Sequence, residues 1–164
     1  MNAQTRDTSV TTLTLPSDRE ILIERVFNAP RRLVFETLTK PEHVARWYGP
    51  RAMTLTSCEI DLRVGGAWRY VLRDPAGNDF GFSGEYREIV PPERLVCTEN
   101  FEGIPPGHDY LVTVTLDEQD GKTKLRSHLQ YKSPEDRDGH IQSGMEPGMR
   151  ETYDRLAELL GTLA

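Results

Sequence analysis

The stretch AWRYVLRDPAGNDFGFSGEYR, residues 67–87, decides the fold class of this chain. Apolar and polar side chains alternate along both of its halves, and the turn-forming residues 74–78 separate the halves. A period of two is typical of strands that bury one face and leave the other in water. The stretch therefore predicts a β-hairpin whose apolar face consists of Trp68, Tyr70, Leu72, Phe80, Phe82 and Tyr86.

The same alternation continues on both sides of this hairpin. From residue 53 to residue 131 it is interrupted by turn-forming residues at 65–66, 91–93 and 117–121, which predicts about six strands. The segment EILIERVF, residues 20–27, adds a first strand, and two short helices are expected after it, near Pro30 and Pro41. We expect an antiparallel sheet of about seven strands with one solvent-exposed face.

A long helix at the C-terminus is predicted to cover the apolar face of this sheet. Apolar residues recur there at helical spacing, namely Met145, Met149, Tyr153, Leu156, Leu160 and Leu163. A helix start at residues 133–136 precedes them, and Gly144, Pro147 and Gly148 predict a kink or break between the two segments. The expected fold class is α+β, with a curved antiparallel sheet wrapped around the long C-terminal helix.

Composition limits the classes of protein to which the chain can belong. The 164 residues, 37% hydrophobic and 28% charged, are expected to form one soluble domain at 19–164 after a mobile tail at 1–18. The net charge of −6 and the scattered basic residues argue against nucleic-acid binding. No apolar run approaches the roughly 20 residues that span a bilayer, and the first residues lack a signal-peptide pattern. We therefore expect no membrane insertion and a cytoplasmic location.

Cysteine and histidine spacing does not indicate a metal or a cofactor. Cys58 and Cys97 belong to no CxxC pattern and are expected to be reduced, structural thiols. The four histidines show no HxxxH or HExxH spacing. The group Asp136, Asp138 and His140 lacks the ligand pattern of a calcium loop and is interpreted as a helix surface. We expect neither a metal nor a cofactor.

Four segments carry a resemblance to known proteins. They are FNAPRRLVFETLTKPEHVARWYGP (27–50), the run at 58–66 with Trp68 after it, GEYREIVPPERLV (84–96) and SGMEPGMRETYDRLAELL (143–160). In this order and spacing they resemble the START/Bet v 1-like (SRPBCC) superfamily. Within it, they resemble the family related to the C-terminal domain of the activator of Hsp90 ATPase. The resemblance covers the chain from about residue 19 to its end.

The resemblance implies a helix-grip fold with a cavity between the sheet and the long helix. It does not imply one activity, because the superfamily includes lipid carriers, hormone and flavonoid binders, polyketide cyclases and a self-sacrificing resistance protein. The family name comes from a co-chaperone, so a chaperone is an alternative partner. We expect no room in this chain for the additional N-terminal domain through which those co-chaperones also engage their chaperone.

Three hypotheses for the function follow. The first is a protein that binds a small hydrophobic or aromatic molecule in the cavity. Its candidate lining is Trp68, Phe82, Tyr86, Val112, Val114, Leu125, Met145, Met149 and Tyr153, with Glu99 and Ser127 as polar anchors. The second is a cyclase-like or hydrolase-like enzyme in which Glu99 or Tyr86 transfers protons. The third is a protein-interaction module that acts on a chaperone.

The orientation of Glu99 bears on the choice among these hypotheses. If Leu95 and Cys97 face inward, strict alternation places Glu99 inward as well. Burial in an apolar cavity would raise its pKa and suit it to proton transfer or to orienting a ligand. If the opposite parity is the inner one, Glu99 is solvated. Arg25 presents the same ambiguity on the first strand.

Overall fold

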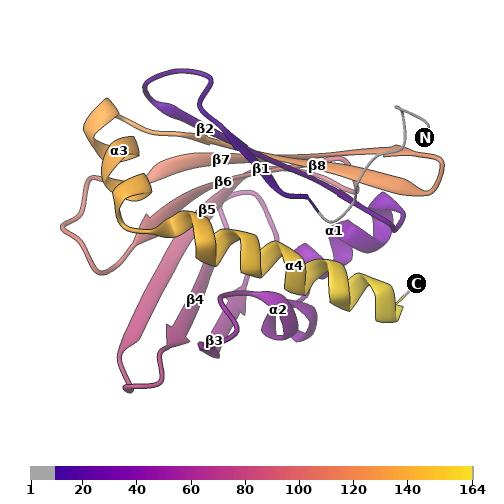
Figure 1. Ribbon diagram of the computed structural model, residues 1–164, viewed down its shortest axis with the longest axis horizontal. Coiled ribbons are helices and arrows are strands. Elements are labelled where there is room, and N and C mark those ends of the chain that lie inside the picture. The colour runs from indigo at the N-terminus through magenta and orange to yellow at the C-terminus, as the bar shows by residue number, and fades with distance from the viewer. Residues whose placement is uncertain (1–9, 164) are drawn as a thin grey trace.

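The computed structural model describes residues 10–163. This part of the chain contains eight strands and four helices, which Figure 1 shows. In chain order they are β1 (Thr12–Thr14), β2 (Glu20–Phe27), α1 (Arg31–Thr39), α2 (Pro41–Trp47), β3 (Thr54–Ile60), β4 (Ala67–Arg73), β5 (Asp79–Val90), β6 (Arg94–Phe101), β7 (Tyr110–Gln119), β8 (Lys122–Gln130), α3 (Pro134–Gln142) and α4 (Met145–Leu163). None of the helices in the described range has the length and apolar character needed to cross a membrane.

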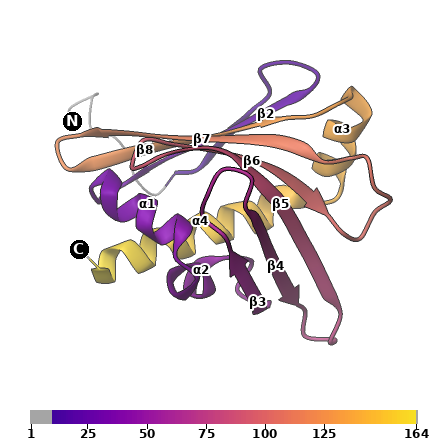
Figure 2. The ribbon, with the colours of Figure 1, turned by 180° about the vertical axis from the view of Figure 1, so that it is seen from behind.

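The strands form one curved sheet that wraps around α4. Their order is β1-β2-β8-β7-β6-β5-β4-β3, and every neighbouring pair is antiparallel. The helices α1 and α2 connect β2 to β3, at the far edge of the sheet, and lie near the C-terminal end of α4 (Figures 1 and 2). The predicted α+β fold, with a curved sheet around a C-terminal helix, is confirmed.

One strand lies inside the segment that the sequence predicts to be a tail. Residues 12–14 form β1, in which Leu13 pairs with Ile23 of β2. Leu13 packs against the core, and the buried side chain of Thr11 accepts a hydrogen bond from Arg25, 3.0 Å away. These contacts order residues that composition alone assigns to a tail. The remainder of the predicted tail, residues 1–9, lies outside the described residues.

The turn between β7 and β8 lies within the predicted turn-forming residues 117–121. Asp120 and Gly121 both adopt positive φ angles, 56° and 77°, which is the conformation of the tightest hairpin connections. This turn joins β7 to β8. The edge of the sheet formed by β3 is less regular, because the pairing of β3 with β4 shifts register between Leu55 and Ser57.

A break separates α3 from α4, as predicted. The side chain of Ser133 accepts a hydrogen bond from the backbone N–H of Asp136, 3.1 Å away, and so caps the start of α3. Gly144 has a φ of 83° and ends this helical segment. Pro147 lies in the first turn of α4, where its missing N–H leaves no hydrogen bond unmade. The chain can therefore change direction at Gly144 and lay α4 across the sheet.

The core consists of two clusters of fully buried residues. The larger one contains Trp68, Tyr86, Leu125 and Leu156, and the smaller one contains Ile21, Tyr110, Val112, Leu129 and Tyr131. The apolar residues that pack against both clusters, Cys97, Val114 and Tyr153, are only half-buried. The core therefore loosens where its two parts meet.

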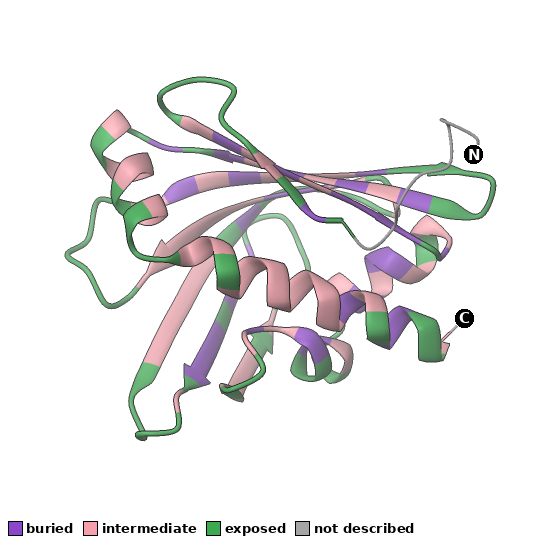
Figure 3. Ribbon diagram, in the orientation of Figure 1, coloured by how far each residue is buried: buried purple, intermediate pink, exposed green. Residues whose placement is uncertain are grey.

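The long helix α4 shows the same division. Its C-terminal half buries Leu156, Leu159 and Leu160 completely, whereas its N-terminal half, from Met145 to Arg155, has no fully buried residue in the described structure. Figure 3 shows this as a mostly pink, half-buried stretch of helix followed by turns in which purple and green alternate. Only one half of α4 is tightly packed on the sheet.

Candidate functional site

Glu99 lies on the inner face of the sheet, among the residues that face α4. Its strand neighbours Leu95 and Cys97 belong to the core, and Glu99 itself is opposite Tyr110 in the pairing of β6 with β7. The Tyr110 hydroxyl donates a short hydrogen bond to Glu99 Oε2. Of the two orientations that the sequence leaves open for Glu99, the structure has the inward one. The residue as a whole is half-buried.

The environment of Glu99 is unusual for a carboxyl group. Burial raises its pKa, and the hydrogen bond from Tyr110 opposes this rise. Among the described residues no Lys, Arg or His side chain forms an ion pair with Glu99, although most other acids on this molecule are paired. The site therefore holds a carboxyl group that can donate or accept a hydrogen bond according to its protonation state.

The side chains of Tyr131 and His140 extend this polar cluster to α3. The hydroxyl of Tyr131 lies 2.5 Å from Nδ1 of His140, and its ring centroid lies 4.7 Å from that of Tyr110. Burial lowers the pKa of His140 to about 4, which keeps the imidazole neutral at physiological pH. The interpretation of His140 as part of a helix surface is wrong, because this side of α3 packs on the sheet.

Tyrosines from the opposite side complete the surroundings of Glu99. Burial, and next the negative charge of Glu99, raise the pKa of Tyr48, which follows α2. Burial likewise raises the pKa of Tyr153 on α4 to about 12; a hydrogen bond with Ser127 lowers it and Glu99 raises it further. Both tyrosines are half-buried. The phenol of Tyr110 thus contacts Glu99 directly, and the charge of Glu99 also acts on the phenols of Tyr48 and Tyr153.

Arg25, whose orientation the sequence leaves open, also lies on the inner face of the sheet. Its guanidinium is buried, and Nη1 lies 2.5 Å from Oδ1 of Asp154 on α4 and 3.0 Å from the Thr11 hydroxyl. The group lies 5.6 Å from the centre of the Phe27 ring. Arg25 therefore connects β2 with α4 and with Thr11, the residue before β1, and its positive charge already has a carboxylate partner.

The candidate lining residues separate into two groups. Phe82, Val114, Met145, Met149 and Tyr153 are half-buried and pack at or beside the junction of the two core clusters; Val112, Ser127 and Glu99 lie with them on the inner face. Trp68, Tyr86 and Leu125 are 4%, 3% and 1% exposed and belong to the tightly packed core. This second group, like Val112 (9%) and Ser127 (5%), offers little surface to a ligand in the described structure.

Burial also keeps the remaining candidate nucleophiles and bases protonated. It raises the pKa of Cys58 to about 11 and that of Cys97 to about 12, and it raises the pKa of Tyr86 as well. Neither thiol nor phenol is thus a base at neutral pH. In the described residues no three His, Cys, Asp or Glu side chains lie together as a metal site would require.

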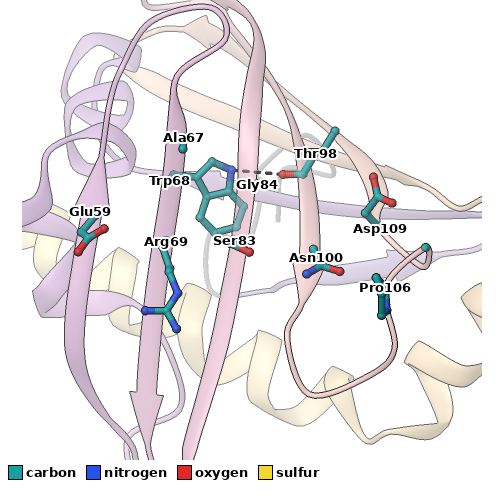
Figure 4. Close-up of a pocket in the computed structure, with 11 residues that line it drawn as sticks. Glu59, Ala67, Trp68, Arg69, Ser83, Gly84, Thr98, Asn100, Pro106 and Asp109 are labelled. Atoms are coloured by element: carbon teal, nitrogen blue, oxygen red, sulfur yellow. Dashed lines mark hydrogen bonds between the residues drawn. The ribbon is translucent and has the colours of Figure 1, made fainter.

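A groove of about 500 Å³ lies on the outer face of the sheet, across β4, β5 and β6 (Figure 4). The polar residues of its lining include Arg69, Ser83, Asn100 and Asp109. Of the predicted ligand-binding residues only Trp68 contributes to it. The groove is open to solvent, and it is separate from the inner cluster around Glu99.

Trp68 reaches the outer groove by crossing β5 at Gly84. Its Nε1 donates a hydrogen bond of 3.2 Å to the carbonyl oxygen of Thr98, as Figure 4 shows. A Cβ atom at position 84 would lie 1.8 Å from that oxygen and 2.6 Å from Nε1, so only glycine fits there. The absence of a side chain at Gly84 and the hydrogen bond to Thr98 thus hold the indole against β5.

Tyr48, Tyr110, Tyr131 and His140 are site residues that sequence reasoning did not identify. Alternation places Tyr110 and Tyr131 on the apolar face, but it does not show that Glu99 is opposite Tyr110. That register depends on the path of residues 102–109 between β6 and β7. An inner Glu flanked by two tyrosines of the apolar parity is the sequence feature that could have indicated the cluster.

Comparisons with known proteins agree with this architecture. The model of the family described as "Activator of Hsp90 ATPase homolog 1-like protein" matches residues 28–161. A crystal structure of a protein from Rhodobacter sphaeroides is similar with a TM-score of 0.86 and 28% identity, covering 94% of this chain and 100% of that one. A crystal structure of a protein from Nitrosomonas europaea has a TM-score of 0.80 and 28% identity, covering 90% of this chain and 97% of that one.

A curated human protein, the "Activator of 90 kDa heat shock protein ATPase homolog 1", is similar over part of its length. The two sequences are 28% identical over 92 residues, which are 54% of this chain and 25% of the human protein. The match therefore spans about a quarter of that relative.

Proposed function

This chain belongs to the Activator of Hsp90 ATPase homolog 1-like family of the SRPBCC superfamily, and we propose that it binds a small hydrophobic or aromatic molecule between the sheet and α4. The observation that carries the proposal is the half-buried junction of the two core clusters. There Cys97 and Val114 of the sheet, and Tyr153 of the loosely packed half of α4, are only partly buried. A single domain normally buries such residues in one continuous core. Their partial exposure favours a recess that accepts a ligand.

The chemistry of the recess also supports this proposal. Its apolar part includes Met145 and Met149, whose flexible thioethers adapt to ligands of different shape. Its polar part consists of Glu99 and the surrounding tyrosines, which can orient one polar group of the ligand. An apolar body with one polar group is therefore the expected ligand.

Thermal unfolding with a panel of ligands tests the proposal. The panel contains fatty acids, flavonoids, aromatic polyketides, sterols and aromatic amines, and at least one member should raise the melting temperature. A ligand specific for the folded state stabilises it by about 2.7 kcal/mol at a hundredfold excess over Kd. This stabilisation gives a clear shift in an 18.7 kDa domain.

A bulky substitution links the effect to the recess. Met149→Trp should abolish ligand-induced stabilisation by filling the space, at a cost of about 1 to 3 kcal/mol in the free energy of unfolding. Ala45→Trp adds a larger side chain at an exposed position of α2 and should leave ligand binding intact. If no panel member shifts the melt, the ligand-binding proposal falls, and a surface interaction with a chaperone becomes the leading hypothesis. Chemical conversion of a bound panel member would instead favour the cyclase-like hypothesis.

A further inference from the structure

The inner face of the sheet carries one basic and one acidic residue, Arg25 and Glu99, and of these two only Arg25 has an ion-pair partner among the described residues. The guanidinium of Arg25 is paired with the carboxylate of Asp154. Glu99 has one hydrogen-bond donor, Tyr110, and forms no ion pair with any side chain in the described range. An inner carboxylate is costly unless a positive charge and further hydrogen bonds compensate for its lost hydration. For Glu99 the residues that the structure describes supply one phenol and no cation.

The rings of Tyr110 and Tyr131 lie together beside this carboxyl group. Tyr110 donates to it, Tyr131 stacks against Tyr110, and the charge of Glu99 raises the pKa of Tyr48 and Tyr153, after the effect of burial. These four tyrosines come from four separate parts of the chain, adjacent to α2, on β7, after β8 and on α4. A carboxylate within a group of aromatic rings is the combination that recognises organic cations, because both the charge and the negative ring faces attract an ammonium group.

On the premise that the recess binds a ligand, we propose that this ligand is an organic amine, with an ammonium group that pairs with Glu99 among the tyrosine rings and an apolar body that lies toward Met145 and Met149. A carboxylic acid fits this position less well, because its negative charge would face that of Glu99. Arg25, the inner cation, is held by Asp154 and Thr11 on the side of Phe27. The pairing of charges thus favours a cation over an anion at Glu99.

Matched ligands test this inference directly. Each set consists of three compounds that share one apolar body, such as naphthylmethyl, indolylethyl or decyl. Within a set, one compound carries an amine, one a hydroxyl and one a carboxyl group. Isothermal titration calorimetry of the full chain should show the amine binding at least about tenfold more tightly than the alcohol, which corresponds to about 1.4 kcal/mol. The carboxylic acid should bind most weakly. In Glu99→Gln, the preference for the amine over the alcohol should disappear, while the alcohol still binds.

A proton count gives an independent readout. If an ammonium group ionises Glu99, amine binding releases a proton at pH values between 4.5, the ordinary pKa of glutamate, and the raised pKa of Glu99 in the free protein, and the alcohol releases none. The release appears as a binding enthalpy that depends on the ionisation enthalpy of the buffer. The titratable groups that face Glu99 are Cys97, Tyr48, Tyr110, Tyr131 and Tyr153, whose pKa values are all raised, and His140 lies beyond them with a lowered pKa. All of them keep their protons unchanged in this pH range.

The outcomes separate this inference from the proposed function. Equal binding of amine and alcohol, or a preference unchanged in Glu99→Gln, would overturn the amine inference and leave the ligand-binding recess in place. Tighter binding of the carboxylic acid would have the same meaning. No binding by any member of any set would reject both. Glu42→Gln, at an exposed position of α2, serves as the control and should keep the preference for the amine.

Discussion

Arg25 and Asp154 meet across the interior of the protein, with Nη1 of one 2.5 Å from Oδ1 of the other, although 129 positions separate them in the chain. The side chain of Arg25 is 4% exposed, and that of Asp154 is 49% exposed. The pair therefore has a buried half and a solvated half. It anchors the middle of α4 to the second strand of the sheet, beside the loosely packed half of the helix.

The asymmetry of this pair makes one stability prediction. Asp154→Ala should lower the free energy of unfolding by about 1.5 to 3 kcal/mol, because it takes a charged hydrogen-bond partner from a guanidinium that stays buried. Arg25→Met should cost less, because the carboxylate left behind can be hydrated. Urea denaturation measures both. Asp61→Ala, which breaks the exposed pair with Arg63, should stay within about 0.5 kcal/mol of the parent.

The two halves of α4 should respond differently to truncation. Leu156 is fully buried, so Leu156→Ala should cost about 2 to 5 kcal/mol by loss of core contacts. Met149 is half-buried, and Met149→Ala should cost only about 1 kcal/mol. Equal losses in denaturant titrations would mean that the helix is packed tightly along its whole length, which would count against the recess.

Glu99 should make stability depend on pH in the direction opposite to that of most acids. Its pKa in the folded state is above the ordinary value of 4.5, so the folded state binds more protons than the unfolded state over the interval between these values. The stability from this shift is present at and below pH 4.5 and is lost as pH rises through the folded-state pKa. Glu99→Gln cannot ionise, so its stability relative to the parent should increase over this pH rise. A difference that is constant with pH would contradict the raised pKa.

His140 should titrate far below an ordinary histidine. Burial lowers its pKa from 6.5 to about 4, so the unfolded state binds more protons than the folded state between these values. The contribution of this group to stability is therefore complete above pH 6.5 and declines as pH falls toward 4. An NMR titration of the histidine ring signals should show one of the four with a midpoint near 4. That signal should vanish in His140→Gln, whereas a midpoint near 6.5 for His140 would show that α3 leaves it exposed.

Arg155 should hold the corner after α2 in place. Its guanidinium donates hydrogen bonds to the carbonyl oxygens of Arg46, Tyr48 and Gly49, of which the shortest is 2.8 Å. Arg155→Met keeps most of the apolar stem and removes these charged hydrogen bonds, so it should cost about 1.5 to 3 kcal/mol in thermal or urea unfolding. Because Tyr48 lies at this corner, the variant should also weaken ligand binding, which the exposed substitution Arg32→Met should not do.

The sheet and the long helix could be predicted because their patterns are local. The alternation of Trp68, Tyr70 and Leu72 with arginines fixes which face of β4 is buried, and all three are at most 9% exposed. The break at Gly144 is equally local, since it depends on one residue that readily adopts a positive φ. By contrast, β1 is only three residues long and is ordered by contacts with β2 and Arg25, which no local pattern contains.

The candidate site was harder to predict because it depends on registers and on distant contacts. On β6 both Leu95 and Val96 are buried, so alternation there does not identify the inner face, and the orientation of Glu99 stays open in the sequence. The helix α3 contains few apolar residues, so its period does not reveal that His140 faces the sheet. The Trp68 ring is assigned to the correct face, yet its contact with Thr98 across Gly84 requires the three-dimensional structure.

The short strand β1 has a consequence for how copies of the protein behave toward one another. A sheet of this kind ends in two rows of backbone groups onto which a strand of another molecule can add. At one end β1 covers residues 22–24 of β2 with three paired residues, and at the other end the irregular pairing near Leu55 disturbs β3. A variant without residues 10–14 would expose eight regular residues of β2 along the edge. The three residues of β1 thus protect the protein against strand addition and aggregation.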